Sequence, residues 1–184
     1  MTKKKFLHVG CGKKRKDSTT SIFNTDQWEE YTLDIDSSCN PTFIGTMTDL
    51  SMIEDSSFDA IYSSHNIEHL FLYDALVAVK EFYRICVHGA KIDIRVPHPR
   101  HDDFISDPTH VRPITVLGLQ LYNKDLNLKW ELSEAANTPM AIIHNVDFRI
   151  KNVSHVLDEK YIDLLKSEKI QKDEIQDLAH KYNN

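Results

Sequence analysis

Two stretches of this chain concentrate groups that can carry out chemistry. The first is the turn Gly10-Cys11-Gly12, which follows a short run, Phe6–Val9, that is apolar except for His8. The second is a segment of 13 residues with six titratable side chains: His98, His101, Asp102, Asp103, Asp107 and His110. A glycine turn lets a ligand approach the backbone, while imidazole and carboxylate groups can exchange protons. The sequence therefore predicts a ligand-binding turn and a separate source of acid–base groups.

The glycine turn fits a nucleoside site. A short apolar run that ends in glycine predicts a buried strand, and residues 31–36 predict a second one. Asp34 lies near the end of that second strand, where a carboxylate suits the two hydroxyls of a ribose. A dinucleotide fingerprint would need a third glycine where Arg15 stands, and a P-loop would need Ser or Thr in place of Lys14. We therefore disfavour NAD and nucleoside triphosphates as ligands.

The segment rich in His and Asp follows a predicted strand, residues 91–96. It should therefore lie at the carboxyl end of the sheet, where ligands bind in open α/β folds. One of its side chains could take a proton from a substrate, and the alternative is a solvated polar loop in which Asp102 and Asp107 cap local backbone. Mixed His and Asp ligands also suit Zn²⁺, but no spacing matches a recognised metal motif, so we predict no metal site.

Composition indicates an ordinary globular protein. Of 184 residues, 41% are hydrophobic and 27% charged, and the net charge is −6. Residues 1–16 hold seven basic residues and no acid, so the other 15 basic and 28 acidic residues sum to −13. The basic run at residues 13–16 could be a solvated loop, or could attract an anionic substrate. A nucleic-acid site is disfavoured because the rest of the chain is acidic and no aromatic residues interleave with the run.

The three cysteines, Cys11, Cys39 and Cys86, are odd in number and lack metal-ligand spacing, which indicates a reducing compartment. No apolar leader precedes the first strand, and no stretch approaches the ~18 apolar residues of a membrane span. We therefore expect a cytoplasmic protein.

Strands that alternate with helices predict an α/β fold: a Rossmann-like, mostly parallel sheet with flanking helices. Residues 13–20 have no helical face, so the first crossover helix should be reduced. We expect one domain, with a core at 5–155 and a helical tail at 156–184. The stripe at Ile175, Leu178, Ala179 and Tyr182 favours core contact over a dimer arm, although a homodimer stays an open alternative.

Further elements follow from periodicity. Short strands are predicted at 42–44 and 58–63. The clearest helix should bury Leu72, Leu76, Val79, Tyr83 and Cys86, reinforced by Ala75 and Phe82, with Asn66 as N-cap and an end near Gly89. A second helix is expected at 113–122 with Pro113 in its first turn. Residues 141–144 and 147–153 predict a hairpin.

Several motifs, in this order, resemble those of class I S-adenosylmethionine-dependent methyltransferases, and more narrowly the small methyltransferase type 11 group. They are Val9-Gly10-Cys11-Gly12, Leu33-Asp34-Ile35, Asp49-Leu50, Ser57-Phe58-Asp59-Ala60-Ile61 and His65-Asn66-Ile67-Glu68-His69-Leu70. The resemblance covers roughly residues 5–115 and implies S-adenosylmethionine as cofactor. Some members of the group accompany surface-polysaccharide genes, so we expect a small-molecule or glycan-precursor acceptor, methylated on oxygen.

The resemblance also implies roles for single positions. Gly10, Cys11 and Gly12 would contact the methionine part of the cofactor through backbone, and Asp34, followed by Ile35, would hold the ribose. Asp49 and Leu50 would frame the adenine, and Ser64 and His65 would line the methionine side. Family members carry a run similar to Asp107-Pro108-Thr109-His110, so our hypothesis makes His110 the general base, oriented by Asp107, with His98 in reserve.

Three positions depart from the family pattern. His8 stands where the family usually has an acid, Lys14 where a third glycine is often found, and Ala90 where a Lys-Pro-Gly-Gly turn ends. These departures keep an alternative open: a catalytically silent module that binds S-adenosylmethionine or a partner protein. A third reading, an RNA-binding protein or RNA methyltransferase, ranks lower.

Overall fold

The computed structural model describes residues 2–19, 21–156, 159–171 and 174. The chain divides into two compact units, residues 1–149 and residues 150–184. The first unit contains the whole sheet, and the second contains the helix α6 (Glu159–Lys166). The predicted stripe at residues 175–182 lies outside the described residues. None of the helices in the described part of the chain has the length and apolar character that a membrane crossing requires.

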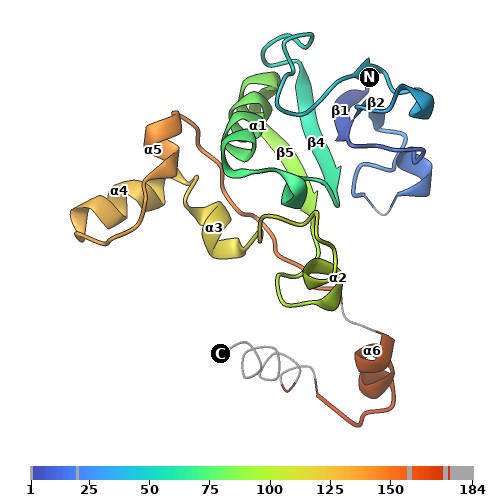
Figure 1. Ribbon diagram of the computed structural model, residues 1–184, viewed down its shortest axis with the longest axis vertical. Helices are drawn as coiled ribbons and strands as arrows, with labels where there is room; N and C mark the ends of the chain where they lie inside the picture. Colours follow the sequence, from blue (N-terminus) through green and yellow to red (C-terminus); the bar gives the residue numbers. More distant parts are fainter. Residues whose placement is uncertain (1, 20, 157–158, 172–173, 175–184) are drawn as a thin grey trace. The chain divides into compact units, whose positions relative to one another are not determined.

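The first unit is built on a five-stranded sheet in the order β3-β2-β1-β4-β5 (Figure 1). The strands are β1 (Lys4–Val9), β2 (Trp28–Asp34), β3 (Phe43–Ile44), β4 (Phe58–Ser64) and β5 (Cys86–Arg95). All neighbouring pairs run parallel. The predicted parallel α/β fold is therefore confirmed. The chain order reverses direction at β1, and parallel sheets of this kind bind ligands in the crevice beyond the carboxyl ends of the strands at such a switch point.

Alternation along β1 divides the core between the two faces of the sheet. Leu7 and Val9 join a cluster with Ile61 of β4 and with Phe82 and Ile85 of the helix α1 (Leu72–Ile85). Phe6 points to the other face and packs with Phe23, Trp28, Ala60 and Tyr62. Phe23 and Trp28 have ring centroids 4.7 Å apart. This aromatic cluster covers a face that a crossover helix would otherwise cover.

The first crossover is reduced, as predicted. Among the described residues between β1 and β2, the only helical segment is the short 3₁₀ turn η1 (Lys16–Ser18). The strand β2 itself begins three residues earlier than predicted and ends at Asp34, so Ile35 and Asp36 lie beyond it.

Helix α1 corrects the sequence prediction at both ends. It begins after Phe71, because Asn66 belongs to a separate 3₁₀ turn, η3 (Ile67–His69), and its side chain donates to the Val9 carbonyl instead (2.9 Å). It ends at Ile85 and passes directly into β5, so Gly89 (φ +78°) lies within β5 rather than at a helix end. A register irregularity opposite Phe58 and Ala60 accompanies this glycine.

The buried face of α1 agrees with the prediction only in part, at Ala75 and Phe82. It consists of Ala75, Ala78, Phe82 and Ile85, whereas Leu72 and Tyr83 are exposed. Both sets recur at helical spacing and lie on adjacent faces of the helix, so periodicity alone could not choose between them.

The regular elements of residues 100–149 are all helices, whereas the sequence predicts one helix and a hairpin in this segment. The structure has α2 (Asp102–Ile105), α3 (Val116–Gln120), α4 (Lys124–Leu132) and α5 (Met140–His144). Pro113 precedes α3, whose N-cap is Thr115. The predicted hairpin at 141–153 was wrong, because the buried Asn127 of α4 accepts the Ala141 N–H (2.9 Å) and fixes that segment as a helix against α4.

The conformation at Gly10 yields a prediction about stability. Gly10 has φ +60°, and a Cβ there would overlap the Asn66 side chain. Gly89 has φ +78°, but a Cβ there would meet nothing within 4 Å. Gly10→Ala should therefore lower the free energy of unfolding by roughly 3 kcal/mol, from backbone strain and overpacking together, and Gly89→Ala by about 1 kcal/mol from strain alone. Urea unfolding of both variants measures the difference, and equal losses would contradict the contact with Asn66.

Candidate functional site

The carboxyl ends of β1 and β2 are joined by hydrogen bonds of the glycine turn. The Gly12 N–H donates to Asp34 Oδ2 (2.7 Å), and the Cys11 N–H donates to the Leu33 carbonyl (3.2 Å). Gly10 and Gly12 both have positive φ, at +60° and +50°. Because a Cβ at Gly12 would meet nothing within 4 Å, the backbone there borders open space that a ligand can enter.

The Asp34 carboxylate keeps capacity for a ligand. Each of its oxygens accepts one backbone N–H, from Gly12 and from Asp36 (2.9 Å). A carboxylate offers about four acceptor sites, so both oxygens can still accept a hydroxyl. Ile35, the next residue, is 77% exposed and presents an apolar surface beside the carboxylate. Together these residues fit a ribose with a flat ring next to it.

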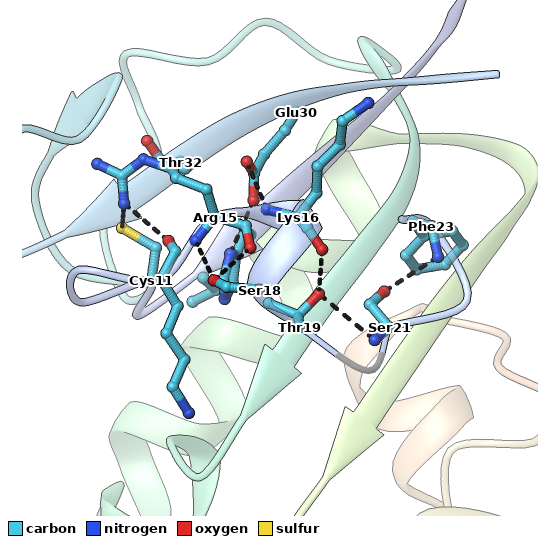
Figure 2. A network of polar contacts seen from close by, with 12 residues as sticks. Cys11, Arg15, Lys16, Ser18, Thr19, Ser21, Phe23, Glu30 and Thr32 are labelled. Carbon is cyan, nitrogen blue, oxygen red and sulfur yellow. Dashed lines mark hydrogen bonds and ion pairs between the residues drawn. The ribbon is translucent and has the colours of Figure 1, made fainter. Parts of the chain in front are cut away.

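The basic loop after the glycine turn is held by a network of polar contacts, part of which Figure 2 shows around Arg15 and Lys16. The Arg15 guanidinium donates to the carbonyls of Gly12 (3.2 Å) and Cys39 (2.6 Å), which ties the turn to the segment after β2. The Lys16 ammonium donates to the Trp28 carbonyl (3.0 Å). Arg15 and Lys16 are half-buried, while Lys13 and Lys14 are exposed. Two of the four cations are thus structural, and two face solvent.

A carboxylate that sequence reasoning missed anchors the same loop. Glu30 of β2 contacts the buried His8 (Oε1–Nδ1 2.9 Å) and accepts the Lys16 N–H through its other oxygen (2.9 Å). His8 occupies the position where the family pattern has an acid. A carboxylate is therefore present on the neighbouring strand, two residues before Thr32, which is the register partner of His8. In the sequence it is one of two adjacent acids, Glu29 and Glu30, and only its half-buried position distinguishes it.

Asp49 and Leu50 differ in what they can contact. Asp49 is exposed, and its carboxylate accepts the Ser51 N–H (3.1 Å). Leu50 is fully buried, and its N–H donates to Glu81 Oε2 (3.0 Å). Arg84 donates to Glu81 and to the Leu50 carbonyl (2.8 Å). Only Asp49 of this pair presents a polar side chain to solvent, on a segment that Glu81 and Arg84 hold.

The end of β4 supplies the third side of the site. Ser64 is half-buried, and His65 is exposed with φ +53° and an N–H that donates to the Arg95 carbonyl (2.9 Å). Asn66 lies directly on Gly10 and donates to the Val9 carbonyl. The structure thus brings the ends of β1 and β4 together, as the sequence predicts.

The candidate acid–base residues fold onto η3. His110 Nε2 lies 4.0 Å from Glu68 Oε1 and 3.8 Å from Asp107 Oδ2. His110 Nδ1 lies 3.1 Å from the Phe104 carbonyl, so Nδ1 carries the proton and donates it there. The Glu68 side chain is fully buried, and neither oxygen has a hydrogen-bond partner among the described residues. The sequence shows Glu68 as part of the His65–Leu70 motif, and that motif does not predict the burial of its carboxylate beside His110.

Asp107 contacts Thr109 more closely than it contacts His110, the residue that it was expected to orient. Its carboxylate accepts the hydroxyl and the N–H of Thr109 (2.6 and 2.8 Å), and these hydrogen bonds lower the pKa of Asp107. Its 3.8 Å separation from His110 is too long for a hydrogen bond. His98, the reserve candidate, is exposed, and its Nδ1 accepts the Arg100 N–H (3.3 Å).

Comparison with known proteins shows which family this part of the chain resembles. Residues 7–93 match the family model of a methyltransferase domain. A search of curated proteins finds no match. That segment contains every residue of the glycine turn, the Asp34 strand end, the Asp49 segment and the end of β4.

Solved structures of other proteins resemble this chain, and two of them, with TM-scores above 0.5, share its fold. A methyltransferase from Archaeoglobus fulgidus, dependent on S-adenosylmethionine, is 18% identical with a TM-score of 0.52, over 90% of this chain and 77% of that one. The YcgJ protein of Bacillus subtilis is 20% identical (TM-score 0.49, 64% of this chain and 58% of that one). A chain of the Haloferax volcanii complex that contains the Trm112 methyltransferase activator is 14% identical (TM-score 0.51, 64% and 57%). In the last two cases the match spans less than two thirds of the neighbour.

The contact between Glu81 and Arg84 predicts a pH dependence. Hydrogen bonds from Arg84 lower the pKa of Glu81 below its ordinary value. The stabilisation is therefore present above the ordinary glutamate pKa and is lost as the pH falls through the lower folded-state value. Glu81→Gln should cost about 1 kcal/mol of unfolding free energy at pH 7 and should flatten the loss of stability below pH ~4.5.

Urea unfolding between neutral and acid pH measures this effect. The exposed Glu131 offers a matched control, and Glu131→Gln should keep the wild-type profile. An unchanged profile in Glu81→Gln would show that the contact does not stabilise the Asp49 segment.

Proposed function

We propose that this protein transfers a methyl group from S-adenosylmethionine to a small-molecule or glycan-precursor acceptor, on oxygen, because residues 7–93 match the family model of a methyltransferase domain. The observation that carries the proposal is the glycine turn held to Asp34, with open space at Gly12 and an exposed Ile35 beside it. This geometry supports a nucleoside site on the domain that the family match defines.

The cofactor would be held by residues from three strand ends. Asp34 would accept the ribose hydroxyls, and the exposed Ile35 would pack on the adenine, with Asp49 near its polar edge. The backbone of Gly10, Cys11 and Gly12, with Ser64 and His65, would surround the methionine part. When bound, S-adenosylmethionine supplies an electrophilic methyl group on a sulfonium. The acidic side chains of Asp34 and Asp49 and the apolar side chain of Ile35 fit a molecule with cationic and uncharged parts.

The protein's task in such a transfer is to hold the acceptor in line with the methyl group and to take its proton. His110 fits the second role, because the Phe104 carbonyl fixes the proton on Nδ1 and leaves Nε2 able to accept one. The neighbouring carboxylates of Glu68 and Asp107 would stabilise the resulting imidazolium. Asp107 acts mainly on the backbone turn that carries His110, so we assign it a positioning role.

The exposed Lys13 and Lys14 support an anionic acceptor, such as a phosphorylated sugar or a sugar nucleotide. Arg15 and Lys16 are bound to backbone carbonyls and do not compete for such a group. The two free ammonium groups lie on the loop that follows the glycine turn. They would attract an anion by long-range electrostatics that weaken with salt.

Removal of the Asp34 carboxylate tests the cofactor site. Asp34→Ala should weaken S-adenosylhomocysteine binding at least tenfold, because two charge-assisted hydrogen bonds are lost. Calorimetric titration measures it, and Asp36→Ala serves as control because the groups that this carboxylate accepts among the described residues are local, at Ser38 and Cys39. Equal affinity of the Asp34 variant and wild type would contradict the proposed ribose contact.

Removal of the His110 imidazole tests the proton acceptor. His110→Ala should lower kcat about 10²- to 10⁴-fold, the usual contribution of a general base, with S-adenosylhomocysteine affinity within twofold of wild type. His98→Ala should keep wild-type kcat. Turnover assays with anionic sugar acceptors measure both variants. If His98→Ala loses activity while His110→Ala keeps it, the roles of the two histidines are reversed.

A further inference from the structure

The fully buried carboxylate of Glu68 needs an explanation. Neither of its oxygens has a hydrogen-bond partner among the described residues, although the surrounding structure excludes water from them. A buried carboxylate without a partner is costly, and buried charges in proteins are paired or coordinate metal ions. The Arg84, Arg95 and Arg149 guanidiniums each contact other carboxylates. The nearest cationic candidates are the imidazoles of His65 (3.8 Å) and His110 (4.0 Å).

The imidazoles of His69 and His110 are in the tautomer that metal ligands adopt. His110 donates from Nδ1 to the Phe104 carbonyl (3.1 Å). His69 Nδ1 faces the Thr109 carbonyl (3.2 Å) and the Thr109 hydroxyl (3.0 Å), whose proton is donated to Asp107. His69 must therefore also donate from Nδ1, and in the neutral imidazole this tautomer leaves Nε2 without a proton in both rings. A metal-bound histidine almost always donates its other N–H to a carbonyl or carboxylate in this way.

We propose that Glu68, His69 and His110 form a binding site for a divalent transition-metal ion. One potential ligand atom from each residue lies within 4.8 Å of the other two. Ligand atoms around a tetrahedral Zn²⁺ are roughly 3.4 Å apart at bond lengths near 2.1 Å, so the 4.0 Å between His110 Nε2 and Glu68 Oε1 closes by a small side-chain rotation. Two imidazoles and one carboxylate favour Zn²⁺ or a similar ion over Mg²⁺ and Ca²⁺, which prefer oxygen ligands.

The backbone already assembles this site. The Glu68 carbonyl accepts the N–H groups of Val111 (3.1 Å) and Arg112 (3.0 Å), which fixes the segment that carries His110 against η3. Phe104 stacks on the His110 ring, with centroids 5.4 Å apart. Because Glu68 and His69 are adjacent whereas His110 comes from a distant segment, the spacing resembles no recognised metal motif. The sequence therefore led us to predict no metal site.

Occupancy would change how the proposed methyl transfer proceeds, and this consequence rests on the proposed function. A ring nitrogen that binds an ion cannot also take a proton. In the metal-bound protein the ion, as a Lewis acid, would lower the pKa of an acceptor hydroxyl, whose proton would leave to water. His110 would then contribute to activity as a ligand rather than as a base.

Titration of the full chain with Co²⁺ and Zn²⁺ tests the site, after removal of any affinity tag and treatment with chelator. We expect one equivalent of Co²⁺ to give visible d–d absorption that Zn²⁺ displaces and an excess of Mg²⁺ does not. Metal affinity should fall at least tenfold in Glu68→Gln, in His69→Ala and in His110→Ala. It should stay unchanged in His88→Ala, which removes an exposed imidazole from β5. Circular dichroism checks that each variant is folded.

The outcomes separate this inference from the proposed function. Absence of stoichiometric binding by wild type, or equal binding by wild type and Glu68→Gln, overturns the metal site. S-adenosylhomocysteine binding is measured on the same samples. Cofactor binding without metal binding would remove the inference alone, whereas metal binding without cofactor binding would remove the proposed function alone.

Discussion

The hydrogen bond from the Gly12 N–H to Asp34, 2.7 Å long, holds the ends of β1 and β2 together, and the candidate site depends on it. It requires a turn with positive φ at Gly10 and Gly12, which other residues adopt only with strain. Asn66, from the end of β4, then lies against Gly10. Three strand ends therefore meet at one backbone turn, and the ligand surface is largely main chain, as expected for a group that must approach closely.

Two of the four cations beside this turn are held by backbone carbonyls. Arg15 and Lys16 donate to those carbonyls, and Glu30 holds the loop through the Lys16 N–H and contacts His8. Glu30 thus places a carboxylate on β2 beside the position at which family members have an acid on β1. Lys13 and Lys14 face solvent.

Features that depend on the residues of a single segment could be predicted from the sequence. The parallel sheet, the reduced crossover and the glycine turn followed from apolar runs, glycine spacing and the position of Asp34. The buried face of α1 and the helix at residues 140–144 did not, because two adjacent faces had equal periodicity and because Asn127, distant in sequence, decides the conformation at Ala141. The burial of Glu68 and its approach to His110 were missed for the same reason, because both arise from tertiary contacts. Pattern within a segment cannot show which distant side chain a group will meet.

Binding of a nucleoside cofactor at the ends of β1, β2 and β4 can be followed by amide NMR of the labelled protein during titration with S-adenosylhomocysteine. We expect saturable shifts at Cys11, Gly12, Ile35, Asp36 and Asp49, and none at the opposite end of the sheet, at Lys4 and Phe58. Absence of saturable shifts, or shifts centred elsewhere in the molecule, would contradict it.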